Sequence, residues 1–116
     1  MDYPRAQTDE LKPYCTKLSM FMEGGVPFFS LEGLRLPAGC EPQVCDALLC
    51  PVTRDNYPSR LYFSVKVKSL YDRNWNCENA RIGEKNWFAF SWKVEGANLT
   101  LAQMLMAHLL GFTKEK

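Results

Sequence analysis

A cysteine in a polar stretch offers the most reactive group in the chain. Cys77 follows Asn76, Asn79 comes two residues later, and the segment lies between Arg73 and Arg81. Exposure and neighbouring cations favour the thiolate, which is the nucleophilic form of cysteine. Asparagine side chains can donate hydrogen bonds to a developing oxyanion. The residue types therefore make Cys77 the candidate nucleophile, with Asn76 or Asn79 as donor. The alternative is a surface cysteine without a role.

The other four cysteines do not have the spacing of a metal site. Cys40, Cys45 and Cys50 are five residues apart, whereas the cysteine pairs of zinc sites are separated by two to four residues. The total is odd and the N-terminus is polar, without the features of a signal peptide, so we expect reduced thiols. Cys15, Cys45 and Cys50 are predicted to pack in the core and Cys40 to lie in a turn. We expect no metal and no cofactor.

Other catalytic patterns are absent from the sequence. It contains no GxGxxG, P-loop or HExxH motif, and a single histidine, His108. His108 falls on the apolar face of a predicted helix, where a buried, hydrogen-bonded structural histidine is expected rather than a catalytic one. A Ser-His or Cys-His catalytic pair is therefore not expected.

Composition narrows the class of protein. The chain has 116 residues, 47% of them hydrophobic, with 14 basic and 13 acidic side chains and a formal net charge of +1. This length fits one domain, residues 1–116, with enough apolar material for a core. The balanced charge argues against nucleic-acid binding, which depends on clustered Lys and Arg. No run is apolar enough to span a membrane. We expect a cytoplasmic domain.

The reactive segment must be positioned by the surrounding elements. Leu11, Cys15, Leu18 and Met22 recur at steps of three and four, which predicts a helix over about 11–23 that Gly24-Gly25 ends. Residues that alternate between apolar and polar predict a strand over 61–67 with one buried face. The remaining expectations are a loose tail over 1–10, strands over 26–36, 44–50 and 87–94, an irregular segment over 69–86, and a C-terminal helix.

The C-terminal helix has a clear boundary at each end. Asn98 or Thr100 can cap its start and Gly111 can end it. Strands in sequence between two helices favour an α+β fold. The prediction is an antiparallel β-meander of three to four strands packed against the N- and C-terminal helices.

Two local patterns indicate a family. Tyr57-Pro58 directly precedes the strand over 61–67, and Trp92 is followed by a helix that begins Leu101-Ala102-Gln103. In element order and in these patterns, residues 26–112 resemble the ubiquitin-conjugating (E2) superfamily, in particular its prokaryotic E2-like and ufmylation-type members. The resemblance implies a bacterial ubiquitin-like conjugation pathway, with an E1-like activating enzyme and a ubiquitin-like protein as partners.

The resemblance leaves the catalytic role open. It implies that Cys77 accepts a ubiquitin-like C-terminus as a thioester and passes it to an amine. However, Gly83 stands at the position where a gap-free comparison expects the nucleophile. The alternatives are a catalytically inactive E2-like scaffold and a domain of unrelated function. Tyr57, Pro58 and Trp75 are the candidate binding residues, Trp75 because an exposed tryptophan is often an interface anchor.

Overall fold

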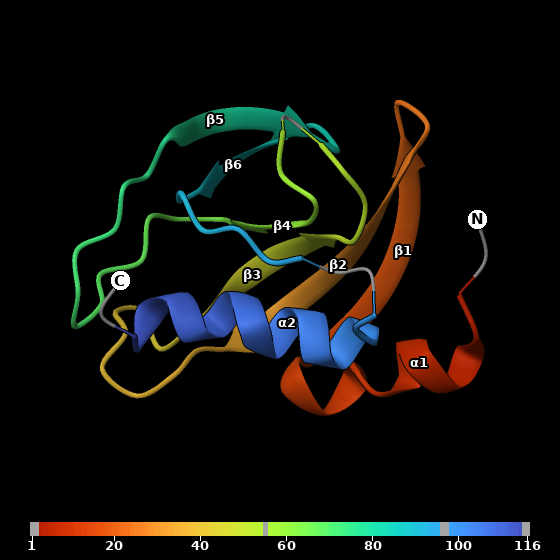
Figure 1. The fold of residues 1–116 in the computed structure, drawn as a ribbon, viewed down its shortest axis with the longest axis horizontal. Helices are drawn as coiled ribbons and strands as arrows, with labels where there is room; N and C mark the ends of the chain where they lie inside the picture. The colour runs from red at the N-terminus through yellow and green to blue at the C-terminus, as the bar shows by residue number, and fades with distance from the viewer. Residues whose placement is uncertain (1–2, 55, 96–97, 115–116) are drawn as a thin grey trace.

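The chain folds as a six-stranded antiparallel sheet with short helices against it, an α+β fold with more than the three to four strands expected (Figure 1). The computed structural model describes residues 3–54, 56–95 and 98–114. The strand order is β1-β2-β3-β4-β6-β5. The elements are α1 (Arg5–Asp9), the 3-10 helix η1 (Lys12–Tyr14), β1 (Lys17–Glu23), β2 (Val26–Arg35), β3 (Val44–Cys50), β4 (Arg60–Phe63), β5 (Cys77–Ile82), β6 (Lys85–Ala89), α2 (Leu101–Leu109) and the 3-10 helix η2 (Leu110–Phe112).

The predicted helix over 11–23 is wrong, because most of this segment is the edge strand β1. β1 pairs with β2 from Lys17 opposite Glu32 to Glu23 opposite Val26. Gly24 and Gly25, with φ of 60° and 76°, form the two-residue turn between the strands, and such turns need positive φ at both positions. The glycines therefore close a hairpin instead of ending a helix. A short helix, α1, lies in the segment expected as a loose tail.

The strands predicted over 26–36 and 44–50 are confirmed as β2 and β3. Between them the register shifts at residues 31–34. Gly33 forms this bulge with φ of 67°, and a Cβ there would lie 2.5 Å from Thr16 Oγ1. The Gly33 amide donates to Asp46 Oδ1 at 2.9 Å. Only glycine fits this position, and the bulge bends the sheet.

The strand predicted over 61–67 is shorter than expected and does not have one polar face. β4 covers four residues, all of them buried. Leu61 and Phe63 face one side of the sheet, while Tyr62, expected on a solvent-exposed face, is fully buried on the other. Val65 is exposed instead. The expectation failed because β4 is central in the sheet and covered on both faces.

The segment expected to be irregular, 69–86, contains a second hairpin. β5 and β6 pair from Cys77 opposite Ala89 to Ile82 opposite Lys85, and Gly83 and Glu84 make the turn. The strand predicted over 87–94 is confirmed only in part, because β6 ends at Ala89. This hairpin carries the sheet beyond β4, so the candidate nucleophile lies in an edge strand and not in a loop.

The C-terminal helix α2 agrees with its prediction. Thr100 accepts a hydrogen bond from the Gln103 amide, and the Gln103 side chain accepts one from the Thr100 amide. This reciprocal capping box satisfies two amides at the helix start. The expected apolar face is buried, His108 included. The chain continues past Leu109 into η2, so Gly111 does not end the helical segment.

Two hydrophobic cores lie on opposite faces of the sheet. Phe29 faces the first core and Phe28 the second, as expected for adjacent strand residues. α2 crosses in front of β2 and β3 in Figure 1 and closes the first core, where Phe63, Phe90 and Phe112 form a contacting aromatic group. The second core consists of Phe28, Leu48, Cys50, Tyr62, Ile82, Trp87 and Ala89.

The sheet curves so that its two ends approach each other. Glu23, at the end of β1, accepts a hydrogen bond from the Gly83 amide in the β5–β6 turn at 3.0 Å. This curvature wraps the β5–β6 hairpin towards the second core. No helix in the described part of the chain is both long and apolar enough to cross a membrane.

Candidate functional site

Three separate segments meet where β4 begins. Arg54 and Tyr57 exchange two backbone hydrogen bonds, of 2.9 and 3.0 Å, in a tight turn that fixes Tyr57 just before the strand. The carbonyl of Asn74 accepts bonds from the amides of Asn76 and Ser91, at 2.9 and 2.7 Å. These bonds join the turn before β5 to the chain after β6. The side chains of Tyr57, Arg60, Asn76, Ser91 and Lys93 gather there, and we call them the Arg60 cluster.

The Tyr57 hydroxyl is the polar centre of the Arg60 cluster. It accepts a hydrogen bond from Asn76 Nδ2 at 2.7 Å and donates to Ser91 Oγ at 3.4 Å. Arg60 Cζ lies 3.9 Å from the centre of the Tyr57 ring, and Lys93 Nζ lies 5.9 Å from it. The bond to Ser91, the bond from Asn76 and the two cations together lower the pKa of Tyr57. The cluster is therefore an electropositive patch around a phenol.

Arg60 is a buried cation without a carboxylate partner in the described part of the chain. It is 4% exposed. Asp72 and Glu95, the acidic residues of the adjoining segments, form no ion pair with it. Its Nη2 donates to Asn76 Oδ1, and its Nε has no acceptor among the residues that the structure describes. Buried charges in proteins are normally paired, so this arrangement is unusual.

Aromatic rings supply part of the stabilisation that Arg60 lacks. Tyr57 covers the guanidinium on one side, and the ring centre of Tyr62 lies 5.9 Å from Cζ. A cation–π contact contributes about 0.5–2 kcal/mol, whereas burying an ion costs several kcal/mol even after the protein relaxes. The rings and the Asn76 bond offset only part of that cost. Arg60 is thus poised to gain from an added anion.

The structure brings two of the six predicted site residues together. Tyr57 and Asn76 share the hydrogen bond described above, and Pro58 follows Tyr57 in the same segment. Trp75 turns the opposite way, into the first core, with ring centres 5.9 Å from Phe63 and 5.1 Å from Phe90. Trp75 is half-buried by these contacts, so its expected role as a binding anchor stays a prediction.

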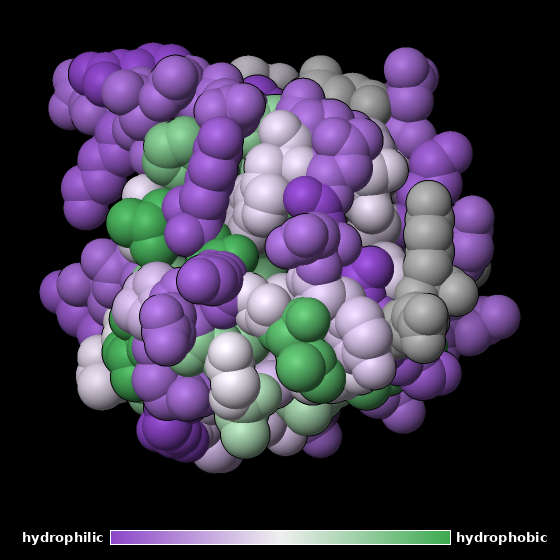
Figure 2. Space-filling model, turned by 90° about the vertical axis from the view of Figure 1, so that its left-hand side faces the viewer, coloured by the Kyte–Doolittle hydropathy of each residue, from purple (hydrophilic) through white to green (hydrophobic). Residues whose placement is uncertain are grey.

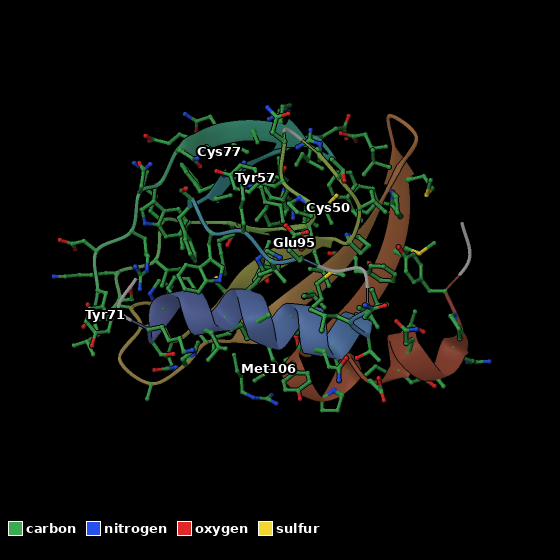
Figure 3. All side chains as sticks on the ribbon, in the orientation of Figure 1. Cys50, Tyr57, Tyr71, Cys77, Glu95 and Met106 are labelled. Carbon is green, nitrogen blue, oxygen red and sulfur yellow. The ribbon has the colours of Figure 1, made fainter. Side chains whose placement is uncertain are left out.

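Cys77 lies beside the Arg60 cluster without joining it. The thiol is half-buried against the second core. Figure 3 shows Tyr57 and Cys77 close to one another. This agrees with the hydrogen bond between Tyr57 and Asn76, the residue before Cys77. The side chain of Asn76 is already bonded to Tyr57 and Arg60. Asn79 is exposed at a bulge in β5, with φ of 59°. Of the two donors expected beside Cys77, Asn76 is thus engaged by other side chains, while Asn79 faces solvent.

The other cysteines are free thiols that pack as small apolar side chains. Cys15, Cys45 and Cys50 are buried as predicted. Cys40 is buried too, and its expected turn position does not expose it. Burial raises the pKa of Cys45 to about 11. Among the described residues no group of His, Cys, Asp and Glu side chains could hold a metal ion.

His108 is confirmed as a structural histidine. Its Nε2 lies 2.9 Å from Ser59 Oγ, and Ser59 Oγ donates to the Val94 carbonyl at 3.0 Å. Because the serine proton is used on Val94, the imidazole must donate at Nε2 and cannot act as a base towards Ser59. Burial and the charge of Arg60 lower the pKa of His108 to about 3. This Ser-His pair is neutral, buried and not catalytic.

Comparisons with known proteins do not assign this chain to a family. The chain matched no protein-family model, no curated protein and no solved structure. The resemblance to the E2 superfamily therefore stays a prediction, and the site has to be interpreted from its own residues.

Sequence reasoning missed Arg60 and Lys93, the two cations of the site. A signal was present, because Arg60 begins an otherwise apolar run, Leu61-Tyr62-Phe63. A long basic side chain next to such a run often keeps its charged end at the surface. Arg60 is buried because the turn that carries Tyr57 folds over it. The sequence pattern does not indicate this arrangement.

Proposed function

We propose that this protein is a non-catalytic binding module whose Arg60 cluster binds a carboxylate group in an acidic segment of a partner protein. The observation that carries the proposal is the buried guanidinium of Arg60, which has no carboxylate partner among the described residues and one N–H without an acceptor. A carboxylate is the anion whose planar geometry suits a guanidinium.

The surface around Arg60 suits an anion that arrives from outside. Ser91, Lys93 and Asn76 are exposed beside the Tyr57 ring. A hydroxyl, an ammonium group and an amide can all donate to carboxylate oxygens. Because Tyr57 covers Arg60 on one side, an anion would approach beside the ring, where these donors are exposed. The exposed donors thus provide the outer contacts and Arg60 the inner charge.

The shape of the surface favours a macromolecular partner over a small metabolite. The depression next to Ser91 has a volume of about 250 Å³ and is lined by Asp72, Arg73, Asn74, Ser91 and Trp92. Enclosed small-molecule sites usually have volumes of about 300–1,000 Å³ and mainly apolar walls. Figure 2 shows a mixed surface on this side of the molecule, with hydrophilic side chains around paler and hydrophobic ones. A carboxylate carried by a protein segment fits such an open surface.

Isothermal titration calorimetry with a short Glu-rich peptide tests the proposal. The peptide should bind, and the same peptide with Gln in place of Glu and an amidated C-terminus should not. Lys93→Glu should weaken binding about tenfold, because it places a negative charge at the entry to Arg60. Lys85→Glu makes the same charge change at the far end of β6 and should leave binding unchanged.

Three outcomes would contradict the proposal. The neutral peptide could bind as well as the acidic one, or Lys93→Glu could bind like the wild type. Inorganic phosphate could also bind more tightly than the peptide, which would make a phosphorylated ligand the better candidate.

The E2-type role of Cys77 stays a second prediction, because Cys77 adjoins the same surface. Two observations weigh against it. The side chain of Asn76 is already engaged, and the only histidine in the chain is bonded to Ser59. Incubation with an E1-like enzyme and its ubiquitin-like protein should give a reducible adduct that Cys77→Ser abolishes. If no adduct forms, the thioester role of Cys77 is lost. The remaining E2-like alternative, an inactive scaffold, is itself a binding module.

A further inference from the structure

One edge of the sheet is open to strand pairing. β1 has seven residues, contains no proline, and pairs only with β2 in the described structure. Met20 and Met22 are 48% and 52% exposed on it. Natural proteins usually protect edge strands with charges, bulges or proline, because the unpaired backbone groups of an edge can bind another strand. β1 has none of these protections at its centre.

The opposite edge, β5, is protected. Its register shifts between Cys77 and Ala80, and Asn79 in that bulge has positive φ. Glu78 and Arg81 are exposed along it. A bulge and charges are the devices that prevent edge pairing. The contrast between the two edges indicates that the exposure of β1 has a use.

The charges at the two ends of β1 are opposite in sign. Lys17 begins the strand and Glu23 ends it, and both are exposed, although one carboxylate oxygen of Glu23 already accepts the Gly83 amide of the same chain. When two copies of β1 lie antiparallel about Met20, Lys17 of each copy lies opposite Glu23 of the other. Opposite charges at facing positions stabilise antiparallel pairs, and like charges destabilise them. The strand is therefore complementary to itself.

The backbone register agrees with this pairing. The two-residue turn makes Glu23 and Val26 the closing pair of the β1–β2 hairpin, and hydrogen-bonded pairs then recur at every second residue. The backbone groups of Leu18, Met20 and Met22 consequently point to the open edge. In the self-pairing, Met20 lies opposite Met20 of the second copy and Leu18 lies opposite Met22. The outward backbone N–H and C=O groups of one copy therefore meet those of the other.

The side chains of the second copy have a place to pack. A hollow of about 190 Å³ beside β1 is lined by Thr8, Leu18, Ser19, Met20 and Phe29. Leu18 and Met20 share one face of β1, so Met22 of the second copy would lie over Leu18 at this hollow. Methionine adapts well to irregular apolar surfaces.

We propose that β1 is a homodimer interface, in which two copies pair their β1 strands antiparallel about Met20 into one continuous twelve-stranded sheet. The interface is isologous, as a two-fold axis requires. It buries one strand edge and a few side chains, so the dimer is weak, with a dissociation constant in the micromolar range. The Arg60 cluster lies on other elements, so each copy keeps its own binding site.

Sedimentation velocity over micromolar to submillimolar concentrations tests this proposal. The wild type should pass from monomer to dimer. Met20→Lys should remain monomeric, because it places two lysines directly opposite each other. Val65→Lys adds the same charge at an exposed apolar residue outside the strands and should still dimerise.

A charge exchange tests the register itself. Lys17→Glu alone and Glu23→Lys alone should each weaken the dimer about tenfold or more, because two like-charged pairs form. The double variant Lys17→Glu/Glu23→Lys should bind more tightly than either single variant, because opposite charges face each other again. The comparison is made with the single variant Glu23→Lys, which likewise lacks the Glu23–Gly83 bond. Circular dichroism on every variant checks that the hairpin is folded.

The proposal is wrong if the wild type stays monomeric throughout, or if Met20→Lys dimerises like the wild type. A double variant that dimerises no more tightly than Glu23→Lys would contradict the register. These outcomes do not test carboxylate binding. That function is tested separately, by comparing peptide binding of the wild type and Lys93→Glu.

Discussion

Arg60 differs at the residue scale from the other buried polar side chains. Ser59 and His108 satisfy each other and the Val94 carbonyl. Arg60 keeps an N–H without an acceptor in the described part of the chain. A fold that needed this residue only for stability would gain more from an apolar side chain, because unpaired buried charge is costly. The residue is therefore better explained by binding than by folding.

Replacing Arg60 by methionine separates the two explanations. Met fills similar space against Tyr57 and Tyr62 without a charge, so Arg60→Met should leave the free energy of unfolding unchanged or raise it by about 1–2 kcal/mol. The same variant should no longer bind the acidic peptide. Urea denaturation measures the first quantity and calorimetry the second. A loss of stability greater than about 2 kcal/mol would make Arg60 a structural residue.

His108 should make stability depend on pH. Its pKa in the folded protein is about 3, below the ordinary value of 6.5, so between these values the unfolded chain binds a proton that the folded one excludes. Stability should be fully present above about pH 6.5 and should fall by up to about 1.4 kcal/mol per pH unit as the pH drops towards 3.

The difference between wild type and a His108→Gln variant isolates this effect, because both share every other titrating group. Denaturant unfolding at a series of pH values should show the steeper decline in the wild type. Parallel pH profiles for the two proteins would mean that His108 is protonated in the folded state.

At the element scale, the sequence predicted elements whose signals are local. The capping box at Thr100 and the apolar stripe after it define α2 without help from the rest of the chain. β2 and β3 were predictable as apolar runs between turns. β1 was not, because Leu18 and Met22 fit a helical step of four as well as a strand step of two. The Gly24-Gly25 turn could have decided between them.

The bulge in β2 gives a prediction at this scale. Gly33→Ala should lower the free energy of unfolding by about 1–3 kcal/mol, because its Cβ would collide with Thr16 while φ is positive. Gly39→Ala is the matched control, since Gly39 also has positive φ but no atom near its Cβ position. Urea denaturation should show the larger loss for Gly33. Equal losses would remove steric contact as the cause.

The whole molecule explains why the site was only partly predictable. Tyr57 and Asn76 are 19 positions apart, and Tyr57 and Ser91 are 34 apart. They meet only because the β5–β6 hairpin pairs with β4. This hairpin lies in the segment that was expected to be irregular. Sequence reasoning reached Asn76 as a hydrogen-bond donor beside Cys77 and Tyr57 from the E2 resemblance. It did not reach Arg60, whose importance depends on burial.

The whole molecule also has two separate surfaces with different predicted partners. The Arg60 cluster is formed by the first residue of β4 and by residues flanking β4, β5 and β6, and the open edge by β1. A dimer through β1 would present two carboxylate sites in one sheet, so a partner with two acidic segments could bind both at once.

The most direct test of the central claim is the NMR signal of the Arg60 Nε–H group during titration with the Glu-rich peptide. We predict that this side-chain resonance shifts and saturates with the same dissociation constant as the calorimetric binding, since a carboxylate then accepts from the guanidinium. The Gln-substituted, amidated peptide should leave it unchanged. An Arg60 Nε–H resonance that does not move while the acidic peptide binds would contradict the account.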